Sequence, residues 1–188
     1  MALKEGDLRN IIVVPYDPAW PEMFRLEAEA IAGVLGELLL AIHHIGSTAV
    51  PGLCAKPIID IMPLVKDIEQ VDAYNDAMAG LGYEAMGEFD IPGRRYFRRG
   101  GGLNRSHQVH AYALGNPEID RHLAFRDYLR AHPQVAEEYC ELKKAVARQF
   151  PHDIYGYMDG KDAFIKAEEQ KAMAWWSQQE DRTPLVGP

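Results

Sequence analysis

The residues with the clearest chemical meaning lie between His43 and Leu64. A Gly46-Ser47 pair follows a short apolar run, and the next apolar run carries a single carboxylate, Asp60. The backbone N–H groups of a glycine-containing turn can hold a phosphate. A carboxylate inside an apolar strand is costly unless it is paired or binds a metal. Together the turn and Asp60 predict an anion cradle facing a metal ligand, the arrangement that holds a metal-bound nucleotide.

Basic side chains supply the second element of this chemistry. Lys56 closes the loop that follows Gly46-Ser47, and arginines concentrate after Gly93 in an otherwise acidic chain. Because side chains alternate along a strand, Arg94 and Arg95 are expected on opposite faces, so that one of them could grip phosphate with bidentate hydrogen bonds. The alternative is a solvated hairpin edge whose charges discourage aggregation. We expect Lys56, Arg94 and Arg95 to offset the negative charge of a ligand.

Three further groups are candidates for the same site. His110 is the better candidate for a ligand or proton carrier. His107 and His110 are expected on opposite faces of a strand, and HxxH spacing on a strand is not a zinc signature, so zinc is not expected. Glu88 could supply a second carboxylate, although pairing with a nearby arginine at the surface, worth at most about 1 kcal/mol, explains it equally well. Lys143 is expected to be a solvated ammonium group on an apolar stem, and Arg126 with Asp127 a structural ion pair.

Motifs spread over most of the chain resemble the GrpB family. They are Val14 to Pro18 followed by Trp20, His44 to Leu53, Lys56 to Ile61, Pro92 to Phe97, His107 to His110, Phe125 to Leu129, and Lys161 with Phe164 and Ile165. The resemblance implies a fold similar to the polymerase-β-type nucleotidyltransferases. It also implies a link to coenzyme chemistry, since some members are fused to dephospho-CoA kinase.

The sequence departs from the nucleotidyltransferase pattern at one position. That pattern has Gly-Ser, a loop, and two carboxylates two residues apart on the next strand; here the second position holds Met62. One reading is a metal-assisted nucleotidyltransferase in which Asp60 coordinates Mg²⁺. The alternative is a non-catalytic module that binds a nucleotide or phosphorylated ligand after losing two-metal chemistry. A third reading, a structural partner of another enzyme, leaves the charge of Asp60 unexplained.

Composition narrows the partners. The chain has 188 residues, 47% hydrophobic and 26% charged, with a net charge of −8. The negative charge argues against duplex nucleic acid, whose binding depends on phosphate neutralisation, but allows a small nucleotide at a local basic site. We see no apolar run of about 20 residues that would span a membrane and no apolar segment of a signal peptide, so a cytoplasmic location is expected. Cys54 and Cys140 are expected to be free buried thiols.

The pattern of apolar residues and of Pro and Gly predicts an α+β fold, with a mixed sheet flanked by helices, over a single domain 1–188. A helical C-terminal section is expected at about 117–179. Strands are predicted at 11–14, 41–45, 58–64, 83–86, 96–98 and 107–114. Helices are predicted at 17–39, 67–81, 117–131, from 133 onwards, and 159–176.

Overall fold

The computed structural model describes residues 10–101 and 104–179 of the chain. Five strands form one mixed sheet in the order β1-β2-β5-β4-β3. Their bounds are β1 Leu39–Ile45, β2 Ile59–Val65, β3 Glu84–Ala85, β4 Arg94–Arg99 and β5 His107–Ala113. β2 and β5 run parallel, and every other neighbouring pair is antiparallel. The predicted α+β fold with a mixed sheet is confirmed, whereas the strand expected at 11–14 is reduced to a single bridge between Val14 and Ala55.

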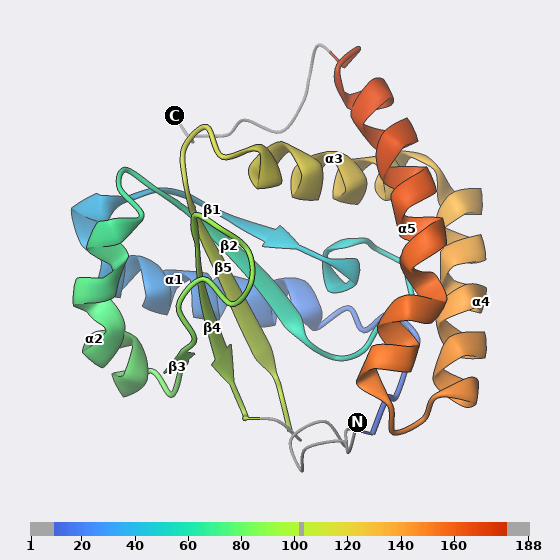
Figure 1. Ribbon diagram of the computed structural model, residues 1–188, viewed down its shortest axis with the longest axis horizontal. Coiled ribbons are helices and arrows are strands. Elements are labelled where there is room, and N and C mark those ends of the chain that lie inside the picture. Colours follow the sequence, from blue (N-terminus) through green and yellow to red (C-terminus); the bar gives the residue numbers. More distant parts are fainter. Residues whose placement is uncertain (1–9, 102–103, 180–188) are drawn as a thin grey trace.

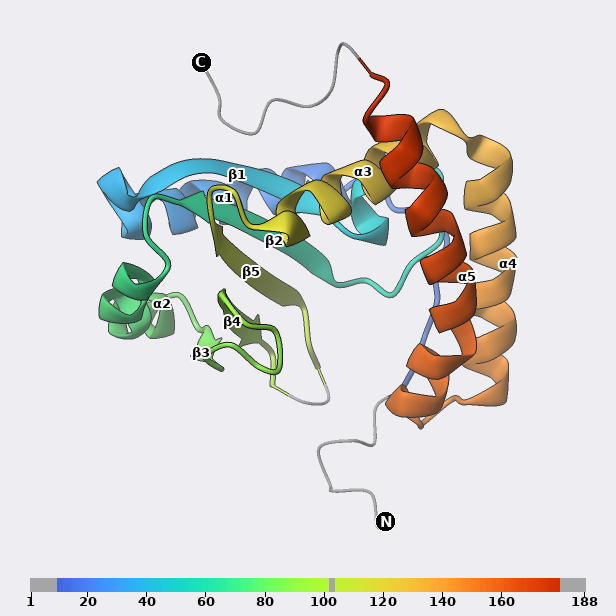
Figure 2. The same ribbon diagram turned by 45° about the horizontal axis from the view of Figure 1, so that its top comes forward.

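Helices cover the sheet on both faces (Figure 1). Their bounds are α1 Trp20–Leu35, α2 Asn75–Gly80, α3 Pro117–Ala131, α4 Pro133–Gln149 and α5 Ile154–Trp176. α1 and α2 lie against one face, while α3 crosses the other face and packs on α5, which in turn packs on α4. Figure 2 shows α4 and α5 standing together beside the ends of β2 and β5, opposite the side that carries α2. The helical C-terminal section predicted from the sequence is therefore present.

Three helices differ from their predicted bounds. The first, α1, begins at Trp20 and ends at Leu35 rather than spanning 17–39, because the 3₁₀ helix η2, Gly36–Leu38, and then β1 follow it. Residues 67–81 do not form one continuous α-helix. Instead the 3₁₀ helix η4, Glu69–Tyr74, precedes α2. Three residues per turn bring Val71 and Tyr74 to the same side, where both contact the core beneath α1. The last helix begins at Ile154 rather than near 159, since the side chain of Asp153 caps it by accepting from two backbone N–H groups.

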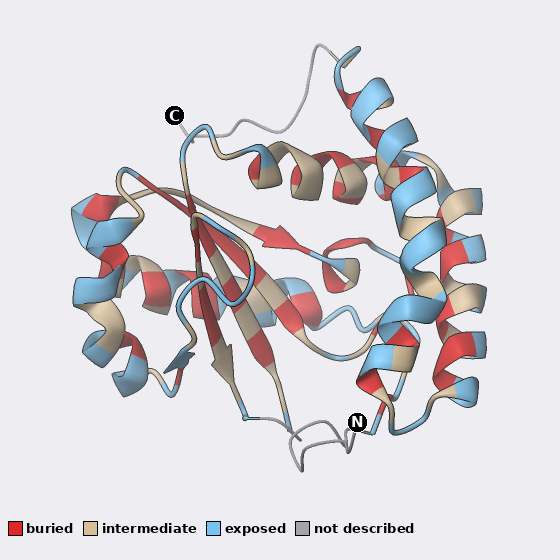
Figure 3. Cartoon of the chain, viewed as in Figure 1, coloured by how far each residue is buried: buried red, intermediate tan, exposed pale blue. Residues whose placement is uncertain are grey.

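β2 is buried along most of its length (Figure 3), and the alternation of its side chains sends them into two apolar cores, one on each face of the sheet. Ile59, Ile61 and Val65 pack under α1 and α2. Met62 and Leu64 point to the other face and pack under α3 and α5. Asp60 shares this second face but lies beyond the apolar cluster, with a quarter of its side chain exposed (25%). The fold thus leaves the carboxylate of Asp60 partly exposed near the start of the buried strand β2.

Candidate functional site

The Gly46-Ser47 turn joins the end of β1 to a short 3₁₀ helix, η3, Ser47–Ala49. Gly46 has a φ of 72°, a conformation that favours glycine. A Cβ atom at Gly46 would also overlap the carboxylate of Asp60. Glycine is therefore required here both by backbone conformation and by the close approach of Asp60. The Gly46-Ser47 turn and the Asp60 carboxylate, which the sequence predicted to face each other, lie side by side.

Two arginines of α3 form hydrogen bonds with the backbone on either side of this turn. Arg126 donates to the carbonyl oxygen of His44 at 3.0 Å, and Arg130 donates twice to that of Ala49, at 2.7 and 3.0 Å. Asp127 pairs with both guanidinium groups, at 2.7 and 3.0 Å. The ion pair expected between Arg126 and Asp127 is confirmed. The structure adds that these residues fix the two carbonyl groups that bracket the turn.

Asp60 begins a row of polar groups that crosses the sheet. His110 on β5 has its Nε2 atom 3.6 Å from Oδ1 of Asp60, and its Nδ1 atom lies 3.3 Å from a guanidinium nitrogen of Arg94 on β4. Arg94 is only 6% exposed, and it donates to the backbone oxygens of Glu88 and Phe89 at 3.2 and 2.6 Å. The loop before β4 therefore fixes Arg94, and Arg94 orients His110 toward Asp60.

Lys143 approaches the turn from α4. Its ammonium group donates to Ser47 Oγ at 3.0 Å and to the backbone oxygen of Cys54, and it lies 4.3 Å from the centre of the Tyr139 ring. The side chain is 2% exposed, so the expectation of a solvated lysine is wrong. The reason is packing: α4 places this side chain over the loop between η3 and β2, where water is excluded. Burial, together with the neighbouring charges of Lys161 and Lys56, lowers the pKa of Lys143 to about 7.

Two more lysines extend this positive region. Lys161 of α5 and Lys56 of the loop before β2 lie over the Tyr157 ring, 5.4 and 5.2 Å from its centre. Burial lowers the pKa of Lys161, and the charge of Asp60 acts in the opposite direction. We refer to Lys56, Lys143 and Lys161 as the lysine cluster. It gathers three cations from three separate segments beside Ser47 and Asp60.

The structure does not bring every expected residue to this site. Arg95 points to the opposite face and forms two hydrogen bonds with Asp72, at 2.7 and 2.8 Å. The carboxylate of Glu88 accepts from the backbone N–H of Gly93 at 2.7 Å and lies 3.9 Å from Arg95. Met62 shares the face of Asp60 but is fully buried under α3. Asp60, His110 and Arg94 therefore form the row of polar groups, without the side chains of Glu88 or Arg95.

The two cysteines form a disulfide, which corrects the expectation of free thiols. Cys54 lies in the loop that leads to Lys56, and Cys140 lies one turn before Lys143 on α4. Packing of α4 on that loop brings the two Cα atoms to 5.4 Å, a separation typical of disulfides. At a sequence separation of 86, their spacing gave no sign of this contact. The disulfide fastens the segments that carry two members of the lysine cluster.

The donor set fits a magnesium ion that arrives with a ligand rather than one held by the protein alone. No group of three or more His, Cys, Asp or Glu side chains suited to a metal occurs within residues 10–101 and 104–179. Asp60 offers carboxylate oxygens at the edge of the site. Mg²⁺ is commonly held by one or two carboxylates together with substrate phosphates and water.

Among the helices of the same ranges, none combines the length and apolar character needed to cross a membrane.

Comparison with solved structures places the fold among nucleotidyltransferases. Terminal uridylyl transferase 4 from Trypanosoma brucei, solved with bound dUTP, aligns over 93% of this chain and 64% of that one, with a TM-score of 0.53 and 14% identity. At this identity the likeness concerns the fold alone. A much nearer structure is the conserved protein GrpB from Enterococcus faecalis, with a TM-score of 0.86 and 49% identity over 89% of this chain and 100% of that one.

Sequence comparison gives the family. A family model described as GrpB protein matches residues 10–171, so the chain belongs to the GrpB family. The UPF0157 protein YqkA of Bacillus subtilis is 48% identical over 167 residues, which cover 89% of this chain and 48% of the relative. The chain thus spans about half the length of that relative. Dephospho-CoA kinase of Mycobacterium tuberculosis is 26% identical over 187 residues, and the match covers 46% of that enzyme.

Proposed function

We propose that this protein binds a Mg²⁺-complexed nucleotide, or a coenzyme that contains one, through its phosphates. The observation that carries the proposal is the buried Lys143 ammonium group, which donates to Ser47 Oγ at the Gly46-Ser47 turn. Gly46 and Ser47 would contact phosphate, the lysine cluster would neutralise it, and Asp60 would be the protein ligand of the metal. The coenzyme alternative is supported by the relatedness to dephospho-CoA kinase.

The charges of the site favour a polyanion. Among the contacts within the described residues, Lys143 donates to a hydroxyl and a carbonyl, which are both neutral acceptors. Holding a cation out of water without an opposite charge is expensive, so an incoming phosphate would relieve this cost. Lys161 and Lys56, which lie over the Tyr157 ring, add to the positive potential at Lys143. A triphosphate or pyrophosphate group matches three clustered lysines better than a single small anion does.

Nucleotidyl transfer is the second candidate function, and we propose that it is weak or absent. His110 lies close enough to Asp60 to move a proton at an acceptor hydroxyl beside it. However, two-metal transfer needs a second oxygen ligand, and Met62 offers an apolar thioether buried under α3. Glu88 is the carboxylate that could restore the ligand if its loop moved. Robust pyrophosphate release that is lost in Glu88→Gln would establish an enzyme in place of a binding module.

A titration of the full-length protein tests the binding proposal. Calorimetry with Mg²⁺ and each of ATP, GTP, CTP, UTP and dephospho-CoA should reveal saturable binding by at least one ligand. Lys143→Met should weaken that binding about tenfold or more, because it removes a charge-assisted hydrogen bond. Lys144→Met is the matched control, since Lys144 lies on the same helix but pairs with Glu141 at the surface. Equal losses in both variants, or no binding by any ligand, would contradict the proposal.

A further inference from the structure

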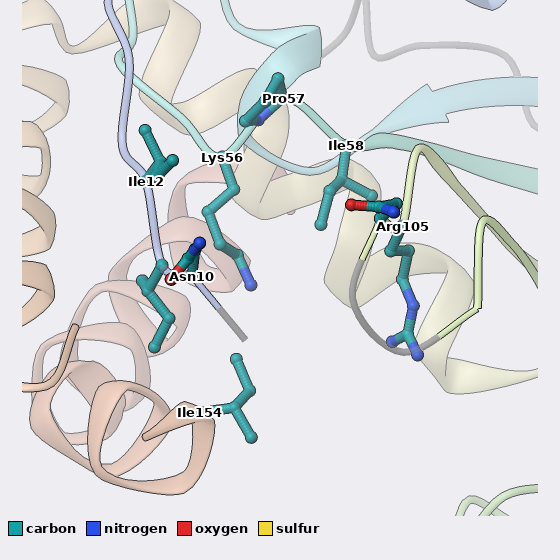
Figure 4. A pocket seen from close by; sticks show the side chains of 9 residues that line it. Asn10, Ile12, Lys56, Pro57, Ile58, Arg105 and Ile154 are labelled. Atoms are coloured by element: carbon teal, nitrogen blue, oxygen red, sulfur yellow. The ribbon is translucent and has the colours of Figure 1, made fainter. Parts of the chain in front are cut away.

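A hollow of about 250 Å³ lies beside the lysine cluster (Figure 4). It is bounded by the segment 10–12, the loop before β2, residues 104–105 just before β5 and the beginning of α5. Four isoleucines and two cations form most of its lining: Ile11, Ile12, Ile58, Ile154, Lys56 and Arg105. Figure 4 shows Lys56 and Ile58 reaching into the space between Asn10 and Ile154 on one side and Arg105 on the other.

Three of the side chains that line the hollow also lie next to residues of the candidate site. Lys56 lines the hollow and also lies over the Tyr157 ring that Lys161 contacts. Ile58 precedes Asp60 by two residues, so the two side chains are roughly 7 Å apart along an extended chain. Arg105 donates to the hydroxyl group of Tyr96 at 3.2 Å, and the Tyr96 ring lies against His110. A molecule in the hollow would therefore touch the neighbours of both Asp60 and His110.

The chemistry of the lining selects the kind of ligand. Isoleucine side chains favour an aliphatic chain, and the Lys56 and Arg105 cations favour a negative group at its end. No aromatic ring is among the described residues that line the hollow, so a nucleobase would find no stacking partner there. The volume is slightly below the usual range for small-molecule sites, which points to a short chain.

We infer that the hollow binds a short aliphatic anion as a second ligand beside the nucleotide. The inference rests on the proposed function, because it treats the hollow as the neighbouring half of the same ligand site. The anionic end would lie between Lys56 and Arg105, close to the metal-binding carboxylate. The aliphatic part would lie against the four isoleucines. Carboxylates and phosphate monoesters share this chemistry, and the experiment below separates them.

Methyl NMR of the full-length protein tests this inference, because four isoleucines report directly on the hollow. With the isoleucine δ1 methyl groups labelled, hexanoate and hexyl phosphate are titrated separately. At least one of these anions should shift the methyl signals of Ile11, Ile12, Ile58 and Ile154 saturably, and the stronger of the two identifies the anionic group. The signals of Ile31 and Ile119, buried in the two cores, serve as internal controls and should not move. Hexan-1-ol has the same chain without the charge and should cause much smaller shifts.

One variant with a matched control tests the role of charge. Arg105→Met should weaken the binding of the anion about tenfold, because a charge-assisted contact is lost. The affinity for Mg²⁺-nucleotide should stay within about twofold of that of the parent protein. Arg25→Met removes the same charge from an exposed position on α1 and should change neither affinity. Equal shifts with hexan-1-ol, or no saturable shift with either anion, would overturn the inference.

The same sample keeps the two proposals distinguishable. If nucleotide binds by calorimetry while the four methyl groups ignore both anions, the hollow is not an anion site and the proposed function stands. If the methyl groups respond to an anion while no nucleotide binds, the hollow is a ligand site and the nucleotide proposal fails.

Discussion

The two faces of the sheet differ in how their charged side chains are paired. On the face covered by α1 and η4, each arginine meets a carboxylate: Arg95 pairs with Asp72, and Arg99 donates to Glu27 at 2.8 Å. On the other side, toward α4 and α5, Arg126 and Arg130 also pair with Asp127, but the lysine cluster gathers beside Asp60 from three separate segments. A charge that is paired within the fold needs no ligand, and it contributes to the stability of the folded protein. A cluster of like charges is costly unless a ligand of opposite sign joins it, and for this reason we propose the second face as the binding face.

Histidines follow the same division. His44 points to the α1 face, where it bonds to Thr48 at 2.9 Å and stacks on Phe24, and burial lowers its pKa to about 4. It is therefore a neutral structural group at any ordinary pH. His110 points to the other face, between Asp60 and Arg94. Two histidines of the same sheet thus differ in their surroundings because strand alternation sends them to different faces.

The largest expected difference between the faces is at their aspartates. Asp60→Asn should abolish Mg²⁺-dependent nucleotide binding while the thermal midpoint changes little, because Asp60 is partly exposed. Asp72→Asn, the matched change on the other face, should leave binding intact and cost only the modest energy of a surface ion pair. Calorimetry and thermal denaturation of both variants give the comparison. Unchanged binding in Asp60→Asn would make this carboxylate structural.

The second prediction concerns pH and the lysine cluster. A phosphate beside Lys143 stabilises its protonated form, so above pH 7 binding should take up a proton and affinity should fall as the pH rises. The slope approaches tenfold per pH unit for one proton. Calorimetry in buffers of different ionisation enthalpy would measure the uptake between pH 7 and 9. Lys143→Met should lose most of this dependence, and a slope that survives in the variant would assign the proton to another group.

The stability of the folded protein should respond to the same group with the opposite sign. The pKa of Lys143 is about 7 in the fold and about 10.4 in an unfolded chain. Between these values the unfolded chain binds more protons, so the contribution of Lys143 to the free energy of unfolding rises with pH. Below pH 7 both states are protonated and the cost of burying the charge is fully present. Denaturant unfolding of the parent protein and Lys143→Met at pH 7 and 9 would show the difference.

The third prediction uses the disulfide, which fastens only the binding face. Cys140→Ser should lower the free energy of unfolding by about 2–4 kcal/mol, the usual effect of removing a crosslink that closes a long loop. Binding should weaken as well, because the disulfide joins the loop that carries Lys56 to the helix that carries Lys143. Denaturant unfolding and calorimetry measure the two effects. A stable variant with unchanged affinity would show that α4 packing alone positions the lysines.

The smallest expected difference separates two adjacent arginines. Arg94→Met removes a 6% exposed cation that holds the backbone before β4 and orients His110, and should cost about 1–3 kcal/mol together with some loss of binding. Arg95→Met removes an ion pair with the exposed Asp72 and should cost at most about 1 kcal/mol with no effect on ligand. Reversed effects would place the ligand on the α1 face.

Local sequence signals predicted the fold well where one element decides its own bounds. Pro117 and Glu118 predicted the start of α3, which ends at Ala131 as expected. The structure adds that the Asn116 side chain caps this helix by accepting from the backbone N–H of Glu118. The start of α5 was missed because Gly156 and Gly160 interrupt the helical pattern. The structure shows why these glycines are there: a Cβ atom at either would overlap Phe150 or Val146 as α5 packs on α4. That requirement is tertiary and leaves no local signal.

The same distinction applies to the site. Gly46, Ser47 and Asp60 lie within one strand-turn-strand unit, so their meeting could be predicted from the sequence. Lys143 is 96 residues from Ser47 along the chain, and only the packing of α4 shows that it is buried against it. A single lysine on an amphipathic helix ordinarily extends into solvent. Its burial follows from contacts between distant segments, which periodicity alone does not encode.

The central claim, that the face bearing Asp60 and the lysine cluster holds a Mg²⁺-nucleotide, is tested most directly by a crystal structure. Crystals soaked with Mg²⁺ and the tightest-binding nucleotide should show phosphates between Ser47, Lys143 and Lys161. Mg²⁺ should lie about 2.1 Å from an Asp60 oxygen. Phosphates bound instead near Arg95 on the α1 face, or a vacant Ser47 turn at saturating nucleotide, would contradict the account.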